Sequence, residues 1–193
     1  AAESREGLKK TFNEGNPELL EGHAKFVGRD SEHFKLEVNG KSITAKQVVI
    51  NTGTRSNIPK IEGLEEIPFI HAGNWLDETT LPEHVVILGA GYIALEMSQF
   101  YRRMGSRVTV IGDGSQVVGR EDADVATALQ TLLQKENITF YLNTNVTKVQ
   151  NKKEKIILTF NRKGDTSKSK DVTAETFASN SQEAQTLEAS HLF

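Results

Sequence analysis

The chain has 193 residues, which is enough for one domain or for parts of two. Hydrophobic residues make up 37% and the net charge is −3, so a packed core is expected and a nucleic-acid or membrane-surface partner is not. The absence of cysteine excludes disulfides and thiolate metal sites, and it favours the cytoplasm. The first ten residues lack the apolar core of an export signal, which indicates a cut or processed start.

The first third of the chain has the pattern of a β-rich region. Residues 1–14 are predicted to form a short helix with Leu8 and Phe12 on one face. Asn39-Gly40 predicts a hairpin turn, because both residues tolerate positive φ. The segments that read as strands are 22–28, 33–38, 41–45 and a short buried strand at 47–51.

From His84 the pattern changes to alternating strands and helices. The predicted order is strand 84–89, helix 92–104, strand 107–111, helix 123–135 and strand 138–142. This order is typical of a parallel sheet with crossover helices. The inner faces are expected at Ile93, Met97, Phe100, Tyr101 and Met104 of the first helix and at Val125, Leu129, Leu132 and Leu133 of the second.

The second helix and the chain after it carry further local signals. Asp122 is a plausible cap for the helix that follows it. Residues 145–150 and 155–160 predict an antiparallel hairpin, residues 161–185 a long polar loop, and residues 186–193 one more strand.

A glycine motif lies between the first of these strands and its helix. Gly89-Ala90-Gly91-Tyr92-Ile93-Ala94 is G-x-G-x-x-A inside a βαβ unit, which is the context of dinucleotide-binding loops. Gly89 permits the tight turn, Gly91 lets the backbone approach a pyrophosphate, and Ala94 lets the helix pack closely on the sheet. The alternative is a glycine turn in an ordinary α/β domain.

The second part of such a fingerprint is an acidic residue at the end of the second strand, where it bonds the ribose 2′-OH. Gly112-Asp113 follows the strand that ends at Ile111, so Asp113 is the candidate. The alternative is that Asp113 is a turn residue in the sequence GDGS.

The stretch from residue 84 to 111 resembles the NAD(P)-binding domain of the pyridine nucleotide-disulfide oxidoreductases. These are FAD enzymes, among them dihydrolipoamide dehydrogenase, glutathione reductase and mercuric reductase. Glu96 completes the family's string G-x-G-Y-I-A-x-E. The resemblance covers about residues 18–160 and is strongest over 84–125.

Residues upstream resemble the end of this family's first FAD segment. Residues 21–26 are similar to its G-x-A segment, with Ala24 facing the FAD adenine, and residues 50–63 are similar to A-T-G-x-x-P-x-x-P-G. The positions that this resemblance assigns to FAD are Ala24, Thr52, Gly53 and Thr54. The stretch departs from the pattern at Asn51, Lys60 and Glu62.

The resemblance also implies roles for the NAD(P) side. Tyr92 would lie over the nicotinamide, Glu96 near the contact between nicotinamide and flavin, and Val146 near the adenine. The alternatives are that Tyr92 is a half-buried aromatic residue, that Glu96 is a solvated helix residue and that Val146 is an ordinary strand residue. The full set implied to bind NAD(P) is Gly89, Ala90, Gly91, Tyr92, Ile93, Ala94, Glu96, Gly112, Asp113 and Val146.

The same resemblance implies a choice between NAD and NADP. NADP-using relatives place arginines at two positions that correspond here to Asp113 and Gly119. A 2′-phosphate ~5 Å from the Asp113 carboxylate would be repelled by roughly 1–2 kcal/mol at an effective dielectric constant of ~40–80. NAD is therefore expected rather than NADP, although Arg120 could reach a 2′-phosphate.

The expected organisation is a partial FAD-binding domain and connector at 1–79 and a Rossmann-type NAD(P)-binding domain at 80–193. The family's first glycine loop and C-x4-C pair are not in this sequence, nor is any metal-ligand spacing among the five histidines. The chain is thus expected to be a piece of an FAD- and NAD(P)H-dependent oxidoreductase, homodimeric as a whole, and to hold no catalytic residue and be inactive alone. The alternative is a free-standing dinucleotide-binding sensor without catalysis.

Overall fold

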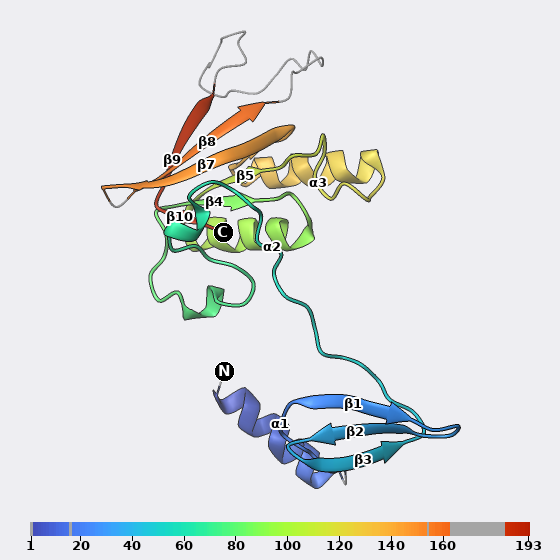
Figure 1. The fold of residues 1–193 in the computed structure, drawn as a ribbon. Coiled ribbons are helices and arrows are strands. Elements are labelled where there is room, and N and C mark those ends of the chain that lie inside the picture. Colours follow the sequence, from blue (N-terminus) through green and yellow to red (C-terminus); the bar gives the residue numbers. More distant parts are fainter. Residues whose placement is uncertain (1, 16, 154, 163–183) are drawn as a thin grey trace. The chain divides into compact units, whose positions relative to one another are not determined.

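The computed structural model describes residues 2–15, 17–153, 155–162 and 184–193. The chain divides into two compact units, Ala1–Thr54 and Arg55–Phe193 (Figure 1). Each unit has its own sheets, and they are described in turn. Most of the predicted polar loop at 161–185 lies outside the described residues.

The first unit is a helix and a three-stranded antiparallel sheet. Helix α1 spans Ala2–Glu14, and the sheet contains β1 (Ala24–Arg29), β2 (Phe34–Val38) and β3 (Lys41–Ala45) in that order. Asn39 and Gly40 have φ values of 48° and 79°, which confirms the predicted hairpin turn between β2 and β3.

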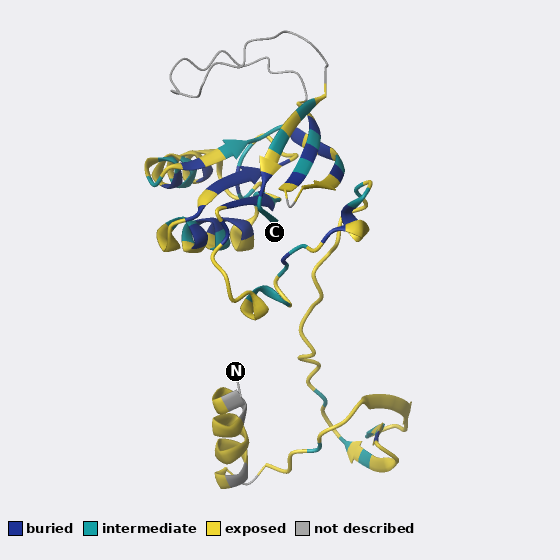
Figure 2. Ribbon diagram, turned by 90° about the vertical axis from the view of Figure 1, so that its left-hand side faces the viewer, coloured by how far each residue is buried: buried dark blue, intermediate teal, exposed yellow. Residues whose placement is uncertain are grey.

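This first unit buries little apolar surface. Val38 is its one buried side chain among those whose burial is described, and Figure 2 shows the unit almost wholly exposed. The predicted strand at 47–51 is wrong: the segment is irregular, and Val49 and Ile50 are 89% and 71% exposed. The physical reason is the lack of a partner, because no described strand bonds its backbone and no described core covers its side chains.

The second unit contains the expected Rossmann-type parallel sheet. Its strand order is β10-β4-β5-β6, and helices α2 and α3 connect the three strands from β4 to β6. An antiparallel sheet in the order β7-β8-β9 accompanies it (Figure 1). The bounds are β4 His84–Leu88, α2 Tyr92–Met104, β5 Arg107–Ile111, α3 Ala123–Lys135, β6 Ile138–Tyr141, β7 Thr144–Lys152, β8 Lys155–Arg162, β9 Gln185–Ala189 and β10 His191–Leu192, with short 3-10 helices η1 (Leu64–Glu66) and η2 (Trp75–Asp77) before them.

Strand β4 is buried on both of its faces. Val85 and Ile87 belong to a core cluster with the inner residues of α2 and α3. Val86 belongs to a second cluster with the inner residues of β7, β8 and β9, and Leu88 packs against that cluster. The apolar run Val85–Leu88 is therefore expected, because neither face of this strand is open to water.

The inner face of α2 differs from the prediction by one residue. Its buried side chains are Ala94, Leu95, Ser98 and Tyr101, so the prediction is confirmed for Tyr101, and the predicted Met97 packs partly buried against the first core cluster. Three predicted inner residues are exposed instead, and these are Ile93 (42%), Phe100 (42%) and Met104 (59%). The small side chains of Ala94 and Ser98 let the helix lie close to the sheet. Ile93, Phe100 and Met104 then lie beside this contact and not within it.

Helix α3 shows a similar correction. Ala126 and Leu133 are its buried residues, whereas Val125 and Leu132 are each 52% exposed. Asp122 occupies the predicted cap position with extended backbone, but its side chain makes no capping hydrogen bond.

Residues 186–193 are not one strand, as predicted, but two. The chain leaves the antiparallel sheet after β9 and enters the parallel sheet as β10, where Leu192 lies opposite Val86. Ser190 lies at the crossing, and its N–H donates to the His84 carbonyl oxygen at 3.0 Å. One segment thereby joins both sheets.

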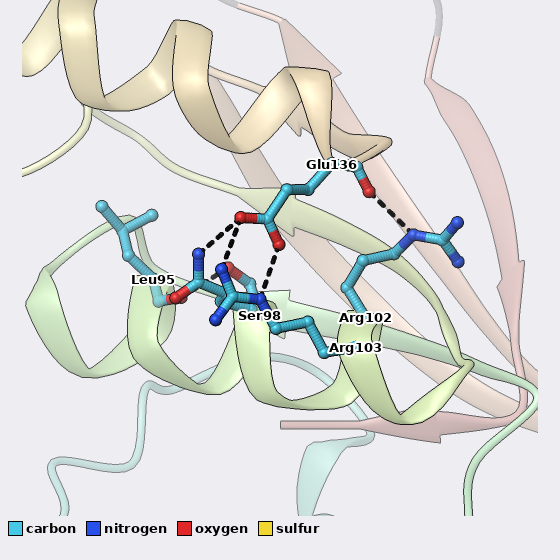
Figure 3. A network of polar contacts seen from close by, with 6 residues as sticks. Leu95, Ser98, Arg102, Arg103 and Glu136 are labelled. Carbon is cyan, nitrogen blue, oxygen red and sulfur yellow. Dashed lines mark hydrogen bonds and ion pairs between the residues drawn. The ribbon is translucent and has the colours of Figure 1, made fainter.

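The ends of the two crossover helices are tied together at Glu136 (Figure 3). Arg103 of α2 donates two hydrogen bonds to the Glu136 carboxylate, at 2.9 and 2.8 Å. Arg102 donates from Nε to the Glu136 carbonyl oxygen at 2.8 Å. A cation at this place also complements the partial negative charge of both helix C-termini. The contact joins the C-terminal end of α2 to the C-terminal end of α3.

A buried histidine links three strands of this unit. His84 is 3% exposed; its Nδ1 lies 2.9 Å from the Glu188 carbonyl oxygen and its Nε2 3.0 Å from the Thr109 hydroxyl. A carbonyl oxygen only accepts, so Nδ1 carries the proton and Nε2 accepts from Thr109. Burial lowers the pKa of His84, and nearby Arg107 lowers it further, against smaller opposite effects of the Glu188 carbonyl and Glu83.

We therefore expect the stability of the second unit to fall on acidification. The unfolded chain takes up a proton at His84 near pH ~6.5, whereas the folded chain resists it, so the stability contribution is complete above that pH and is lost as the pH falls below it. Urea unfolding from pH 7.5 to 5 should show this loss, and His84→Asn should reduce the slope. Equal pH slopes in the two proteins would contradict the account.

Gly63 allows the segment before η1 to pair with β7. Glu62 accepts a hydrogen bond from the Val149 N–H at 2.8 Å and forms an ion pair with Lys148 at 2.6 Å. Gly63 has a φ of 80°, and a Cβ there would overlap the Val149 carbonyl oxygen. Both the backbone conformation and the close approach require glycine.

We expect Gly63→Ala to destabilise the second unit by at least about 2 kcal/mol, from left-handed backbone strain and overlap with a backbone oxygen. The matched control is Gly119→Ala, because a Cβ at Gly119 meets nothing within 4 Å. Urea unfolding measures both. A Gly63→Ala protein as stable as the Gly119→Ala protein would show that this packing is wrong.

Candidate functional site

The glycine motif forms a tight turn at the carboxyl end of β4. Gly89 has a φ of 100°, and its N–H donates to the Ile111 carbonyl oxygen at 2.7 Å. Gly91 is the N-cap residue of α2, with φ −80° and ψ 177°, and Leu95 donates the first helical hydrogen bond to its carbonyl oxygen at 3.1 Å. The motif therefore has the strand–turn–helix geometry that its sequence predicts.

Open space lies over this turn. A Cβ placed on Gly89 or on Gly91 would meet no heavy atom within 4 Å. The N-terminus of α2 has no side-chain cap and no acidic residue in its first turn, so its N–H groups remain available. Free N–H groups and the positive end of the helix dipole suit an anion such as a pyrophosphate.

A second loop supports the glycine turn from the side of β5. Gly112 is buried, and a Cβ there would lie 2.9 Å from the Ala90 Cβ, so the absence of a side chain lets the two loops touch. The Val118 N–H donates to the Ala90 carbonyl oxygen at 2.8 Å. The next residue, Asp113, is exposed at the end of β5. The structure thus brings Gly112 and Asp113 beside the glycine turn.

A cavity of about 330 Å³ opens on the other side of the turn. It lies where the strand order reverses, because the chain continues from β4 to β5 on one side and β10 lies on the other. Ligands of open α/β sheets bind at such a switch point. The lining residues are Ser56, Asn57, Ile58, Pro59, Leu64, Phe69, Ile70, His71, Ala72, Leu88, Gly89, Gly91, Tyr92, Ile93, Ala94, Leu192 and Phe193.

The sequence-predicted NAD(P) residues divide into three groups. Gly89, Gly91, Tyr92, Ile93 and Ala94 line the cavity, and Tyr92 is 70% exposed. Ala90, Gly112 and Asp113 form the contact between the two loops and the end of β5.

Two predicted residues lie elsewhere. Glu96 is exposed on α2 and is not among the lining residues. Val146 is 8% exposed in the second core cluster, where it packs with the antiparallel sheet.

The predicted FAD residues lie in the first unit. Ala24 is exposed at the start of β1, opposite Val38. Thr52, Gly53 and Thr54 follow in an exposed stretch without helix or strand, and Gly53 has a φ of 71°.

Sequence reasoning missed one wall of the cavity. Ser56, Asn57 and His71 come from the connector, Leu192 comes from β10, and Phe193 follows it. Ser56 and Asn57 lie in the stretch 50–63 that the resemblance relates to FAD, and no local motif marks His71, Leu192 or Phe193. Only the fold brings these residues to the glycine turn. None of the described lining residues is Asp, Glu, Lys or Arg, so the cavity suits an uncharged and largely apolar group.

The described residues contain no group of side chains suited to hold a metal ion. Among the same residues, no helix is long and apolar enough to cross a membrane.

Comparison with known proteins agrees with this geometry. Residues 2–180 match the family profile described as pyridine nucleotide-disulphide oxidoreductase. The dihydrolipoyl dehydrogenase of Cupriavidus necator is 34% identical over 158 residues, which are 81% of this chain and 33% of that protein. The mercuric reductase of Bacillus cereus is 31% identical over 133 residues, which are 69% of this chain and 20% of that protein.

Solved structures share the fold. The HOCl-induced flavoprotein disulfide reductase RclA of Escherichia coli superposes with a TM-score of 0.71 at 25% identity, over 96% of this chain and 38% of that one. LpdA of Mycobacterium tuberculosis gives a TM-score of 0.73 at 18% identity, over 99% of this chain and 39% of that one.

The chain therefore spans about a third or less of the curated relatives it matches here. With a family profile that covers residues 2–180, and with the glycine turn, the parallel sheet and the switch-point cavity all in place, the chain belongs to the pyridine nucleotide-disulphide oxidoreductase family.

Proposed function

We propose that this chain supplies the nicotinamide-dinucleotide site of an FAD- and NAD(P)H-dependent oxidoreductase. In this proposal the whole protein passes hydride from the nicotinamide to the flavin, and electrons then reach a disulfide or another acceptor. The observation that carries it is the open glycine turn at the uncapped N-terminus of α2. An anion-binding turn suits the pyrophosphate of a nicotinamide dinucleotide, and the uncharged cavity beside it suits the nicotinamide ring.

Each part of the site has a role in this proposal. The N–H groups that follow Gly91 bind the pyrophosphate, and Asp113 binds the ribose of the adenosine half on the β5 side. The nicotinamide half then extends to the β10 side, into the cavity beside Tyr92. Val118 holds the Ala90 carbonyl, so the turn is oriented before the ligand arrives. The bound nicotinamide supplies the hydride chemistry, and these residues bind and orient it.

This chain offers fewer residues for contact with FAD than for contact with the nicotinamide dinucleotide. Ala24 and Thr52–Thr54 offer exposed backbone in the first unit, which suits flanking contacts to a nucleotide. The sequence has one G-x-G-x-x-A motif, which the dinucleotide site already uses, so no second phosphate loop is present in this chain for the flavin nucleotide. We accordingly assign residues 1–79 a supporting role toward FAD and residues 80–193 the nicotinamide site, with 56–72 forming one wall of its cavity.

The test of this proposal is Gly91→Val. The backbone at Gly91 is extended, with φ −80°, and its Cβ direction is empty, so a valine side chain fits the unliganded fold. The same side chain would occupy the space of the pyrophosphate. We expect at least a tenfold loss of NADH affinity in a fluorescence titration of the 193-residue chain, with an unchanged thermal midpoint. Gly7→Ala is the control, because it adds a Cβ to open space in α1, away from every residue assigned to the site. Equal NADH affinity in the unmodified, Gly91→Val and Gly7→Ala proteins would refute the assignment.

Asp113 provides a second test, of cofactor preference. Its carboxylate would repel a 2′-phosphate by roughly 1–2 kcal/mol, so we expect the chain to prefer NADH over NADPH. Asp113→Asn should raise NADPH affinity about tenfold and leave NADH affinity within a few-fold. Glu65→Gln, which removes an exposed carboxylate from η1, is the control. Preference for NADPH in the unmodified chain would overturn this part of the proposal.

A further inference from the structure

His71 is the one imidazole among the described residues that line the switch-point cavity. It lies between η1 and η2, on a segment that is bonded to the last strand through the Ile70 N–H and the Leu192 carbonyl oxygen at 2.7 Å. The cavity wall that holds His71 is thus attached to β10 and does not depend on the first unit. His71 and Tyr92 are the two described lining residues with titratable side chains.

A tight turn holds His71 in place. Its N–H donates to the Asn74 side-chain oxygen at 2.6 Å, and its carbonyl oxygen accepts from the N–H groups of Asn74 and Trp75, both at 3.0 Å. Asn74 also donates from its amide to the Phe69 carbonyl oxygen at 3.1 Å. This set of bonds restricts the backbone on both sides of the imidazole.

The turn also sets the tautomer of the imidazole. The Gly73 N–H donates to the His71 Nδ1 at 3.0 Å, so Nδ1 is an acceptor and the neutral ring carries its proton on Nε2. Gly73 must be glycine for this contact, because a Cβ there would lie 2.9 Å from the His71 Cε1. The Nε2 atom has no hydrogen-bond partner among the described residues and is not a buried unsatisfied atom, so it is open to solvent or a ligand.

The cavity that His71 lines is mostly apolar. Leu64, Phe69, Leu88, Ile93 and Leu192 contribute side chains to it. A flat ring with one polar substituent suits such a site, and a single fixed donor then determines the orientation of that ring. The nicotinamide ring has this form, and its carboxamide oxygen is an acceptor.

We infer that His71 is a specificity-determining residue of the nicotinamide pocket, and that its Nε2–H donates a hydrogen bond to the carboxamide oxygen. The inference rests on the proposed dinucleotide site. It adds a residue from the connector that no motif of the sequence marks. The ligand also has acceptors in its pyrophosphate, its ribose hydroxyls and its adenine. These acceptors are present in ADP-ribose, which lacks the nicotinamide ring, so a comparison of NADH with ADP-ribose isolates the contact to the carboxamide.

The test uses two substitutions that each preserve one side of the imidazole. His71→Asn keeps an acceptor for the Gly73 N–H but removes the donor at Nε2. His71→Gln keeps a donor near the Nε2 position. We expect His71→Asn to weaken NADH binding by about three- to tenfold, the effect of one hydrogen bond, with ADP-ribose affinity unchanged. His71→Gln should restore NADH affinity to within about twofold.

Unchanged ADP-ribose affinity also shows that each variant is folded at the site. Equal NADH affinity in the unmodified and His71→Asn proteins would overturn the role of His71 and leave the dinucleotide site standing. An equal loss for NADH and ADP-ribose would also overturn it, since the contact would then be to the pyrophosphate or to the fold. Failure of the proposed function is distinct: the unmodified chain would bind neither ligand, and Gly91→Val would change nothing.

Discussion

The central constraint of this structure is that β4 is buried on both faces and then turns sharply into a helix. Val85, Val86 and Ile87 are fully buried, each stabilising the fold by roughly 1.5–3 kcal/mol. The turn that follows needs the positive φ of Gly89 and the close approach of Gly112 to Ala90. The packed core thus holds the strand in place, and the strand ends in an open turn whose N–H groups have no side-chain cap. The binding that we propose here would follow from packing, because hydrogen bonds from Gly89 to Ile111 and from Val118 to Ala90 hold the turn without any ligand.

The two units differ in how much buried apolar core each of them contains. In the second unit, both sheets and both helices share two core clusters, and the Glu136 contacts lock the helices together. Among the side chains of the first unit whose burial is described, Val38 alone is buried. The ion pairs Lys9–Glu21 and Lys41–Glu18 of this unit are exposed, and exposed pairs stabilise a fold little. Its apolar residues, such as Val49 and Ile50, are left without cover among the described residues. The stability of the proposed dinucleotide site therefore depends on the second unit.

Local sequence signals predicted the parts of this fold that depend on local physics. The strand–helix alternation from His84 to Tyr141 is confirmed, as are the Asn39-Gly40 turn and the glycine turn, because hydrophobic period and turn residues are encoded in short stretches of sequence. The errors arise where tertiary packing decides. The inner face of α2 is shifted because Ala94 and Ser98 allow close contact with the sheet, and the cavity wall from the connector and β10 is assembled only by the fold. For the same reason a residue such as His71 carries no signal in the sequence.

The central claim is that the glycine turn binds a nicotinamide dinucleotide. The most direct measurement is an NMR titration of the 15N-labelled 193-residue chain with NADH, following each backbone amide. The account predicts saturable shifts that are largest at residues 89–95, with smaller ones at Asp113 and His71 and none in β1–β3. Binding that shifts other amides and leaves residues 89–95 unchanged, or no saturable shift at all, would contradict it.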